Sequence, residues 1–249
     1  MTQVSSETVS DTSASDGQMI MPFYLIVDVS SSMSGDIGEL RTALDDMVQA
    51  ILEDPVVDDL VMLGIITFNH TATTVVPLCP PSEVNVPALQ ASGGTSYGAA
   101  FHEFKRAFDA DRARLKGQGM RVYRPCVFFL TDGAPGDRDH LTTFRSLFAY
   151  DPESGTGNKA FPYFVPFGFR DAPEDVIRAL AYPNFGKTKG RWFLSRSSNV
   201  REILRAMTEV IGQTALSSGQ SVAAGAPQIV TPQPAQGMDT QFGDAGDWM

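Results

Sequence analysis

The sequence predicts an α/β fold, a doubly wound and mainly parallel sheet with one antiparallel edge strand. Short apolar runs alternate along the chain with longer segments whose apolar residues recur at every third or fourth position. Such alternation is typical of parallel strands joined by helices that cover both faces of a sheet. Two β-rich runs also flank Asn69 and His70, which indicates a hairpin and therefore an antiparallel strand at the edge.

The elements of the first half follow from these patterns. Residues 23–29 form a continuous apolar run, as expected of a strand that is buried on both faces. Residues 36–53 carry apolar side chains at the i, i+3, i+4 and i+7 positions of an amphipathic helix. The hairpin strands cover 60–68 and 71–79, and a second long helix is predicted over 96–116.

The same alternation continues in the second half. Apolar runs predict strands at 126–131, 163–168 and 191–194, and the first of these is followed by a helix over 138–149. Because these strands are separated by helices, we expect them to join the sheet in parallel.

Two capping patterns locate the last helices. Asp171 and Glu174 form a capping-box-like start to a helix that ends before Pro183. Asn199 starts a final helix over 199–216, whose apolar side chains share one face.

A single folded domain is predicted over 20–218. Residues 1–19 are rich in Ser, Thr and Asp and lack apolar periodicity, so we expect a disordered N-terminal segment. Residues 219–249 are rich in Gly, Ala, Pro and Gln, so we expect a disordered, acidic C-terminal tail.

Composition narrows the classes of function. The formal net charge of −10 disfavours nucleic-acid binding, which normally uses a basic domain. No apolar run is long enough for a membrane span. A secretory leader would require a basic residue near its start, and no Lys or Arg precedes Arg41. Cys79 and Cys126 are far apart, so free thiols in a reducing compartment are expected, and the predicted location is cytoplasmic.

Oxygen-bearing side chains follow the predicted strands where parallel sheets bind ligands. Asp28 lies at the end of the first predicted strand, Ser30 and Ser32 follow it, and Asp132 comes directly after the strand at 126–131. Thr95 lies in the loop before the second long helix. Because the carboxyl ends of parallel strands meet at one edge of the sheet, these loops are expected to converge. An oxygen-only set suits Mg²⁺, with Mn²⁺ or Ca²⁺ as alternatives, rather than zinc.

The charge of this set suggests a binding mechanism. If hydroxyls fill several inner positions, the two carboxylates do not saturate a dication. An octahedral Mg²⁺ then keeps at least one exchangeable water, which a stronger anionic ligand replaces. We expect that ligand to be an Asp or Glu side chain of another protein.

The same motifs resemble the metal-ion-dependent adhesion site of von Willebrand factor A (VWA) domains, over about residues 21–217. The resemblance implies direct coordination by Ser30 and Ser32, and coordination by Asp28 and Asp132 either directly or through water. It also implies that Thr95 binds in one of two conformations, between which the final helix shifts. The domain would be a non-enzymatic adaptor.

Within this family the chain is similar to bacterial TerY-type proteins. The stretches 22–28, 94–98 and 129–133 carry that finer likeness. It implies a role in a tellurite- or stress-response system, with a kinase or phosphatase of the same operon as the partner.

Other functions stay open at this point. Asp28 is also the candidate nucleophile of a metal-dependent phosphotransferase or hydrolase, although the haloacid dehalogenase pattern requires a second aspartate where Ser30 stands. A third hypothesis is a scaffold protein that acts through its acidic ends. Ser32 or Thr95 would also serve simply as a helix cap. The phosphate-loop-like stretch 181–188 follows a helix rather than a strand, which argues against nucleotide binding there.

Overall fold

The computed structural model describes residues 17–53, 59–186, 189–196, 200–230 and 240–244. Residues 1–16 of the predicted disordered segment 1–19, the cap residue Asn199 and the end of the phosphate-loop-like stretch lie outside these ranges, whereas Met19 already belongs to the first strand.

A central sheet holds most of the strands, in the order β10-β9-β8-β5-β1-β2-β3, and β4 pairs with β1 beside this path. The strands are β1 (Met19–Asp28), β2 (Val61–Phe68), β3 (Ala72–Cys79), β4 (Arg121–Val122), β5 (Cys126–Thr131), β8 (Tyr163–Phe169), β9 (Arg191–Ser195) and β10 (Thr240–Asp244). Neighbours pair in parallel except at the two edges, where β3 and β10 are antiparallel. The predicted doubly wound, mainly parallel sheet with its antiparallel hairpin strand is therefore confirmed.

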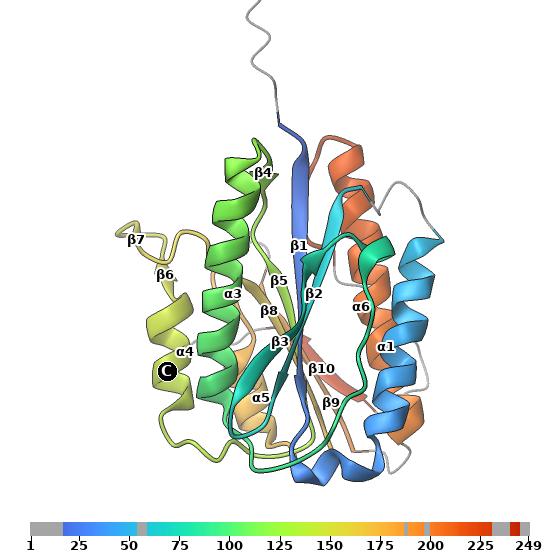
Figure 1. Ribbon diagram of the computed structural model, residues 1–249. Coiled ribbons are helices and arrows are strands. Elements are labelled where there is room, and N and C mark those ends of the chain that lie inside the picture. The colour runs from blue at the N-terminus through green and yellow to red at the C-terminus, as the bar shows by residue number, and fades with distance from the viewer. Residues whose placement is uncertain (1–16, 54–58, 187–188, 197–199, 231–239, 245–249) are drawn as a thin grey trace, which may run out of the picture.

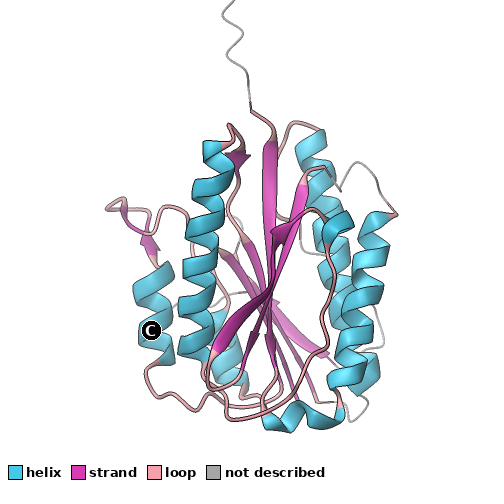
Figure 2. Ribbon diagram, in the orientation of Figure 1, coloured by secondary structure: helices cyan, strands magenta, loops and turns pink. Residues whose placement is uncertain are grey.

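Helices cover both faces of the sheet (Figures 1 and 2). One face carries α1 (Ile37–Leu52) and α6 (Val200–Ala223), and the other carries α3 (Tyr97–Gly117), α4 (His140–Phe148) and α5 (Glu174–Leu180). The short turns η1 (Ser31–Gly35) and η2 (Pro81–Glu83) and the small hairpin β6 (Tyr150–Asp151) and β7 (Thr156–Gly157) complete the described elements.

The central strands are apolar throughout because side chains alternate between two cores. In β1, Phe23 and Leu25 point into the core under α1 and α6, whereas Tyr24 and Ile26 point into the core under α3 and α4. In β5, Phe129 joins the second core, where its ring stacks on Phe68 at a centroid distance of 4.9 Å. Burial on both sides fixes the register of β1 and β5, and therefore the position of their ends.

The C-terminal region departs from the prediction of a disordered tail over 219–249. Helix α6 continues to Ala223, and the segment after it folds back along the helix. Two serine hydroxyls hold it there, because Ser218 accepts from the Val230 amide at 3.0 Å and Ser221 from the Gln228 amide at 3.0 Å. The strand β10 then adds to the edge of the sheet beside β9.

The predicted capping box of α5 is also wrong. Pro173 is the residue before the helix, and no side chain caps it. Asp171 instead donates its backbone N–H to the carbonyl of Asp132 at 3.1 Å, so it joins the loop after β8 to the loop after β5. Cys79 and Cys126 are free, as predicted.

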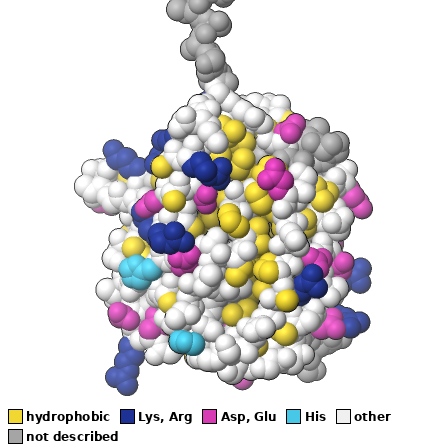
Figure 3. Space-filling view, in the orientation of Figure 1, with side chains coloured by type: hydrophobic (Ala, Val, Ile, Leu, Met, Phe, Trp, Pro, Cys, Tyr) yellow, Lys and Arg dark blue, Asp and Glu magenta, His cyan; other side chains and the backbone are white. Residues whose placement is uncertain are grey.

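The exposed edge of the sheet is protected against further strand pairing. In β3, Pro77 has no N–H to offer, and the Thr74 amide donates to the Glu103 carboxylate of α3 at 3.0 Å. Figure 3, which views the molecule from the side of β3, shows apolar side chains along the middle of the surface. Charged and proline-blocked edges are a common defence against edge-to-edge association.

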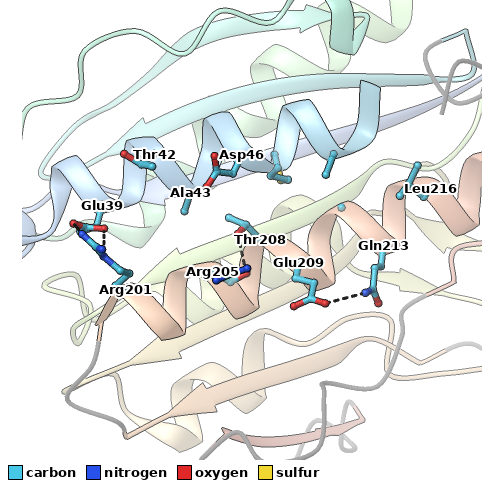
Figure 4. Close-up of a pocket in the computed structure, with 13 residues that line it drawn as sticks. Glu39, Thr42, Ala43, Asp46, Arg201, Arg205, Thr208, Glu209, Gln213 and Leu216 are labelled. Carbon is cyan, nitrogen blue, oxygen red and sulfur yellow. Dashed lines mark hydrogen bonds and ion pairs between the residues drawn. The ribbon is translucent and has the colours of Figure 1, made fainter. Parts of the chain in front are cut away.

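A groove of about 740 Å³ runs between α1 and α6 (Figure 4). An ion pair between Glu39 and Arg201, at 2.5 Å, links the two helices at one end of it. Gly212 of α6 faces α1, and a Cβ there would lie 3.8 Å from the Met47 side chain, which is an ordinary van der Waals contact.

Two glycines with different surroundings, one crowded and one open, give a matched test of packing in the domain. A Cβ on Gly190 would lie 2.2 Å from the backbone nitrogen of Tyr182, whose backbone is held by two hydrogen bonds to Phe164. We expect Gly190→Ala to lower the free energy of unfolding by about 3 kcal/mol. Gly38 is exposed in α1 with no neighbour around its Cβ position, so Gly38→Ala should stabilise the domain by about 0.5–1 kcal/mol. Urea unfolding measures both changes, and equal effects would contradict this account of the packing.

Candidate metal centre

The candidate site lies where the strand order reverses. After β1 the chain builds β2 and β3 on one side, and it then crosses to β5 on the other side of β1. Val27 pairs with Leu130, so the next residues, Asp28 and Thr131, lie side by side at the carboxyl ends of adjacent parallel strands. This reversal point is the usual ligand position in doubly wound sheets. In Figure 1 it is the end at which β1 leads into η1.

Asp28 is fixed through both of its carboxylate oxygens. Its Oδ1 accepts from the Ser30 amide at 2.8 Å, and its Oδ2 accepts from the Thr131 hydroxyl at 2.7 Å. The side chain is buried, and this burial raises the pKa of Asp28 above its ordinary value even though the hydrogen bonds act to lower it. The negative charge of Asp132 raises the pKa further. A nearby cation would stabilise the ionised form.

Four of the five predicted donors form one chain of contacts. The hydroxyls of Ser30 and Ser32 lie 3.0 Å apart, and Ser32 donates to Oδ1 of Asp132 at 2.8 Å. In an octahedral sphere with ligands at roughly 2.1 Å, neighbouring oxygens are about 3.0 Å apart. The spacing of Ser30, Ser32 and Asp132 therefore fits adjacent ligands of one hard cation.

Thr95 is held next to this cluster by its backbone. The Ser31 amide donates to the carbonyl of Gly93 at 3.0 Å, and the Gly136 amide donates to the carbonyl of Thr95 at 2.7 Å. These bonds tie the Thr95 loop to both of the other loops. The Thr95 hydroxyl itself has no hydrogen bond to any residue that the structure describes, so it is available as a further donor.

The capping alternatives do not apply. The Ser96 hydroxyl, not that of Thr95, accepts from the Ala99 amide at 3.2 Å and caps α3. Helix α1 follows Asp36 and has no side-chain cap. Ser32 is therefore free to face Asp132.

A buried tyrosine, Tyr97, contacts the residues at the end of β5 that hold the cluster in place. The Tyr97 hydroxyl donates to the Gly133 carbonyl at 2.7 Å and lies 3.2 Å from the Thr131 hydroxyl, which in turn bonds Asp28. Burial raises the pKa of Tyr97 far above its ordinary range, so this hydroxyl keeps its proton. This role of Tyr97 was not predicted from the sequence, although Tyr97 lies only two residues after Thr95.

Arg170 was also missed. Its Nη1 lies 3.4 Å from Oδ2 of Asp132, and its Nη2 lies 2.5 Å from Oδ2 of Asp36. The one available signal was its position two residues after the predicted strand 163–168, at the same edge of the sheet as the donors.

The donor chemistry favours a hard cation. Within the described ranges, no three His, Cys, Asp or Glu side chains form a group able to hold a metal ion. A cation at this cluster would therefore depend on the hydroxyls of Ser30, Ser32 and Thr95 as well as on the two carboxylates. The residues fit Mg²⁺, Mn²⁺ or Ca²⁺, which prefer oxygen ligands.

The raised pKa of Asp28 predicts a pH dependence. The folded protein holds this proton more tightly than the unfolded chain does, so the stability contributed by Asp28 is fully present below its ordinary pKa of 3.8. That contribution is lost as the pH rises through the raised value. Without divalent cations, Asp28→Asn should therefore become more stable relative to wild type as the pH rises above 3.8. Urea unfolding across this range tests it, with Asp109→Asn on the outside of α3 as control; a difference that does not vary with pH would refute it.

Tyr97→Phe should weaken both the fold and the site. It removes the buried hydrogen bond to the Gly133 carbonyl and the polar contact with the Thr131 hydroxyl, so we expect a loss of about 1–2 kcal/mol in unfolding free energy, together with weaker Mn²⁺ binding. Tyr163→Phe is the matched control. Tyr163 lies at the start of β8, the end of that strand away from the cluster, and its hydroxyl donates to the Lys189 carbonyl at 2.7 Å. It should lower stability alone. If both variants bind Mn²⁺ equally well, Tyr97 has no positioning role.

The described helices include none that is long and apolar enough to cross a membrane.

No curated protein matches the chain by sequence. Among solved structures, a von Willebrand factor type A protein from Catenulispora acidiphila is 17% identical with a TM-score of 0.52, and the match covers 80% of this chain and 43% of that one.

Two other solved structures share the fold. Proximal thread matrix protein 1 from the mussel byssus is 14% identical with a TM-score of 0.55, over 81% of this chain and 49% of that one. The pilus adhesin SpaC from Lactobacillus rhamnosus GG is 14% identical with a TM-score of 0.55, over 81% of this chain and 31% of that one. The chain thus spans less than half the length of these proteins. The family model described as von Willebrand factor type A domain matches residues 23–134, which include all five predicted donors, so this part of the chain is similar to that family.

Proposed function

We propose that this domain binds another protein through a divalent cation, with Mg²⁺ as the resident ion. Asp28, Ser30, Ser32, Thr95 and Asp132 would hold the ion, and a carboxylate of the partner would complete its coordination. The observation that carries the proposal is the contact chain from Ser30 through Ser32 to Asp132, whose oxygen spacing matches adjacent ligands of one ion.

The donor types at the cluster support an anionic partner group. Two carboxylates, Asp28 and Asp132, face the proposed ion, and Arg170, which contacts Asp132, is paired more closely with Asp36. Asp36 thus balances the arginine, and Asp28 and Asp132 balance the dication. The other proposed donors are neutral hydroxyls, so an Asp or Glu side chain of another protein would be a stronger ligand than the water that it displaces.

The fold supports a binding role. A pilus adhesin and a byssal thread matrix protein have the same fold, although their low identity carries no information about ligands. The TerY-type likeness adds the further proposal that the partner is a kinase or phosphatase in a tellurite- or stress-response system.

The geometry disfavours Asp28 as the nucleophile of a phosphotransferase or hydrolase. Both of its oxygens accept hydrogen bonds, and its side chain is only 1% exposed. A nucleophile needs a free oxygen that faces the substrate. Asp28 is placed to orient ligands rather than to attack.

Metal binding and partner binding are tested separately. Loss of groups that merely support a metal ligand typically costs 10–100-fold in affinity, so we expect Asp132→Asn to weaken Mn²⁺ binding by at least about a hundredfold. Electron paramagnetic resonance of free Mn²⁺ gives the dissociation constants, and Asp109→Asn should match wild type. If Asp132→Asn binds Mn²⁺ with the wild-type dissociation constant, the proposal of a cation site at this cluster is wrong.

Partner binding is then measured by capture from a host lysate. A specific protein should be retained by wild type in Mg²⁺, released by EDTA, and absent with Asp132→Asn. A partner that is retained equally in EDTA would show that binding does not use the ion.

A further inference from the structure

We propose that Arg170 makes binding of the cation and of the partner's carboxylate cooperative. Its positive charge weakens binding of the cation alone, and its guanidinium binds the carboxylate oxygen that the cation leaves free. This inference rests on the proposed function, because it assigns a role to a residue at the edge of the same site.

The guanidinium lies against the groups that would hold the ion. Nη1 is 3.4 Å from Oδ2 of Asp132 and 3.5 Å from the carbonyl oxygen of Ser32. Nη2 is 2.5 Å from Oδ2 of Asp36, the residue between η1 and α1. About a third of the Arg170 side chain remains exposed (33%), so an incoming group can reach it.

The backbone of Arg170 is held in place from several sides. It has a φ of 50°, and no other non-glycine residue in the described ranges has a positive φ. Arg196 donates to the carbonyl of Arg170 and, at 3.0 Å, to that of Ala172. The next amide, of Asp171, donates to the carbonyl of Asp132 at 3.1 Å. A residue held in an unfavourable conformation by its surroundings often has a functional role.

This position has two electrostatic consequences. A fixed positive charge beside a dication site lowers the affinity for the dication, and it also competes with it for Asp132. When a carboxylate arrives, the same charge becomes favourable. One carboxylate oxygen coordinates the ion, and the other accepts from the guanidinium, whose planar donors suit this geometry.

A purely structural role makes a different prediction. If Arg170 only ties the loop before α1 to the loop after β8, removing either partner of its pair with Asp36 loosens the site. Arg170→Gln and Asp36→Asn would then both weaken cation binding. In our proposal the two changes act in opposite directions, because one removes a positive charge and the other a negative charge next to the ion.

The test measures Mn²⁺ affinity of the full chain in acetate and in chloride at equal ionic strength, with acetate as the carboxylate probe. For wild type, acetate should tighten Mn²⁺ binding. Arg170→Gln should bind Mn²⁺ about tenfold more tightly in chloride and lose most of the acetate effect. Asp36→Asn should bind Mn²⁺ more weakly than wild type. Arg201→Gln, which removes an equivalent charge from the exposed pair with Glu39 on α1 and α6, should match wild type in both buffers.

The outcomes separate this inference from the proposed function. If wild type and Arg170→Gln have the same Mn²⁺ affinity and the same response to acetate, Arg170 has no such role, although the cation site stands. Weaker Mn²⁺ binding by both Arg170→Gln and Asp36→Asn would also overturn it, in favour of the structural role. Absence of Mn²⁺ binding by wild type would overturn the proposed function, and this inference with it.

Discussion

The hydrogen bond from Thr131 to Asp28 joins the ends of the two central strands, and the rest of the site is built on it. It forms because β1 and β5 are parallel neighbours in a register that two apolar cores fix. With Oδ2 bound to Thr131 and Oδ1 bound to the Ser30 amide, Asp28 sets the direction of the turn that follows. That turn brings Ser32 to Asp132. Burial of the apolar strands thus fixes their register, and this register fixes the positions of the oxygen atoms in the cluster.

This arrangement has a cost in stability. Two buried carboxylates, Asp28 and Asp132, lie close enough that each charge disfavours the other, and burial adds to the effect on Asp28. Water would solvate these charges better than the surrounding strands do. The hydroxyls and Arg170 offset part of this cost. A bound cation would offset more, which couples the stability of this end of the sheet to its ligand.

The fold and the meeting of the predicted donor residues at one edge of the sheet were predictable from sequence because both depend on local patterns. Apolar runs mark buried strands, and polar residues directly after them lie at a known edge of the sheet. Arg170 was not predictable in the same way, since its contact with Asp132 depends on a left-handed backbone and on Arg196. The strand β10 was missed because its sequence has no strong strand pattern. It is stabilised by the open edge of β9, which lies far away in the chain.

The antiparallel direction of β10 has a mechanical consequence. Thr240 pairs with Ser195 at the end of the sheet that carries the oxygen cluster, and Asp244 pairs with Arg191, which the register places level with Leu25 in the middle of β1. Strand β10 therefore runs from the cluster end of the sheet only as far as its middle. If the chain were pulled at Asp244, β10 would peel from β9 one hydrogen bond at a time, because β9 is its one neighbour among the described strands. The central strand β1, paired on both sides, would bear load only afterwards.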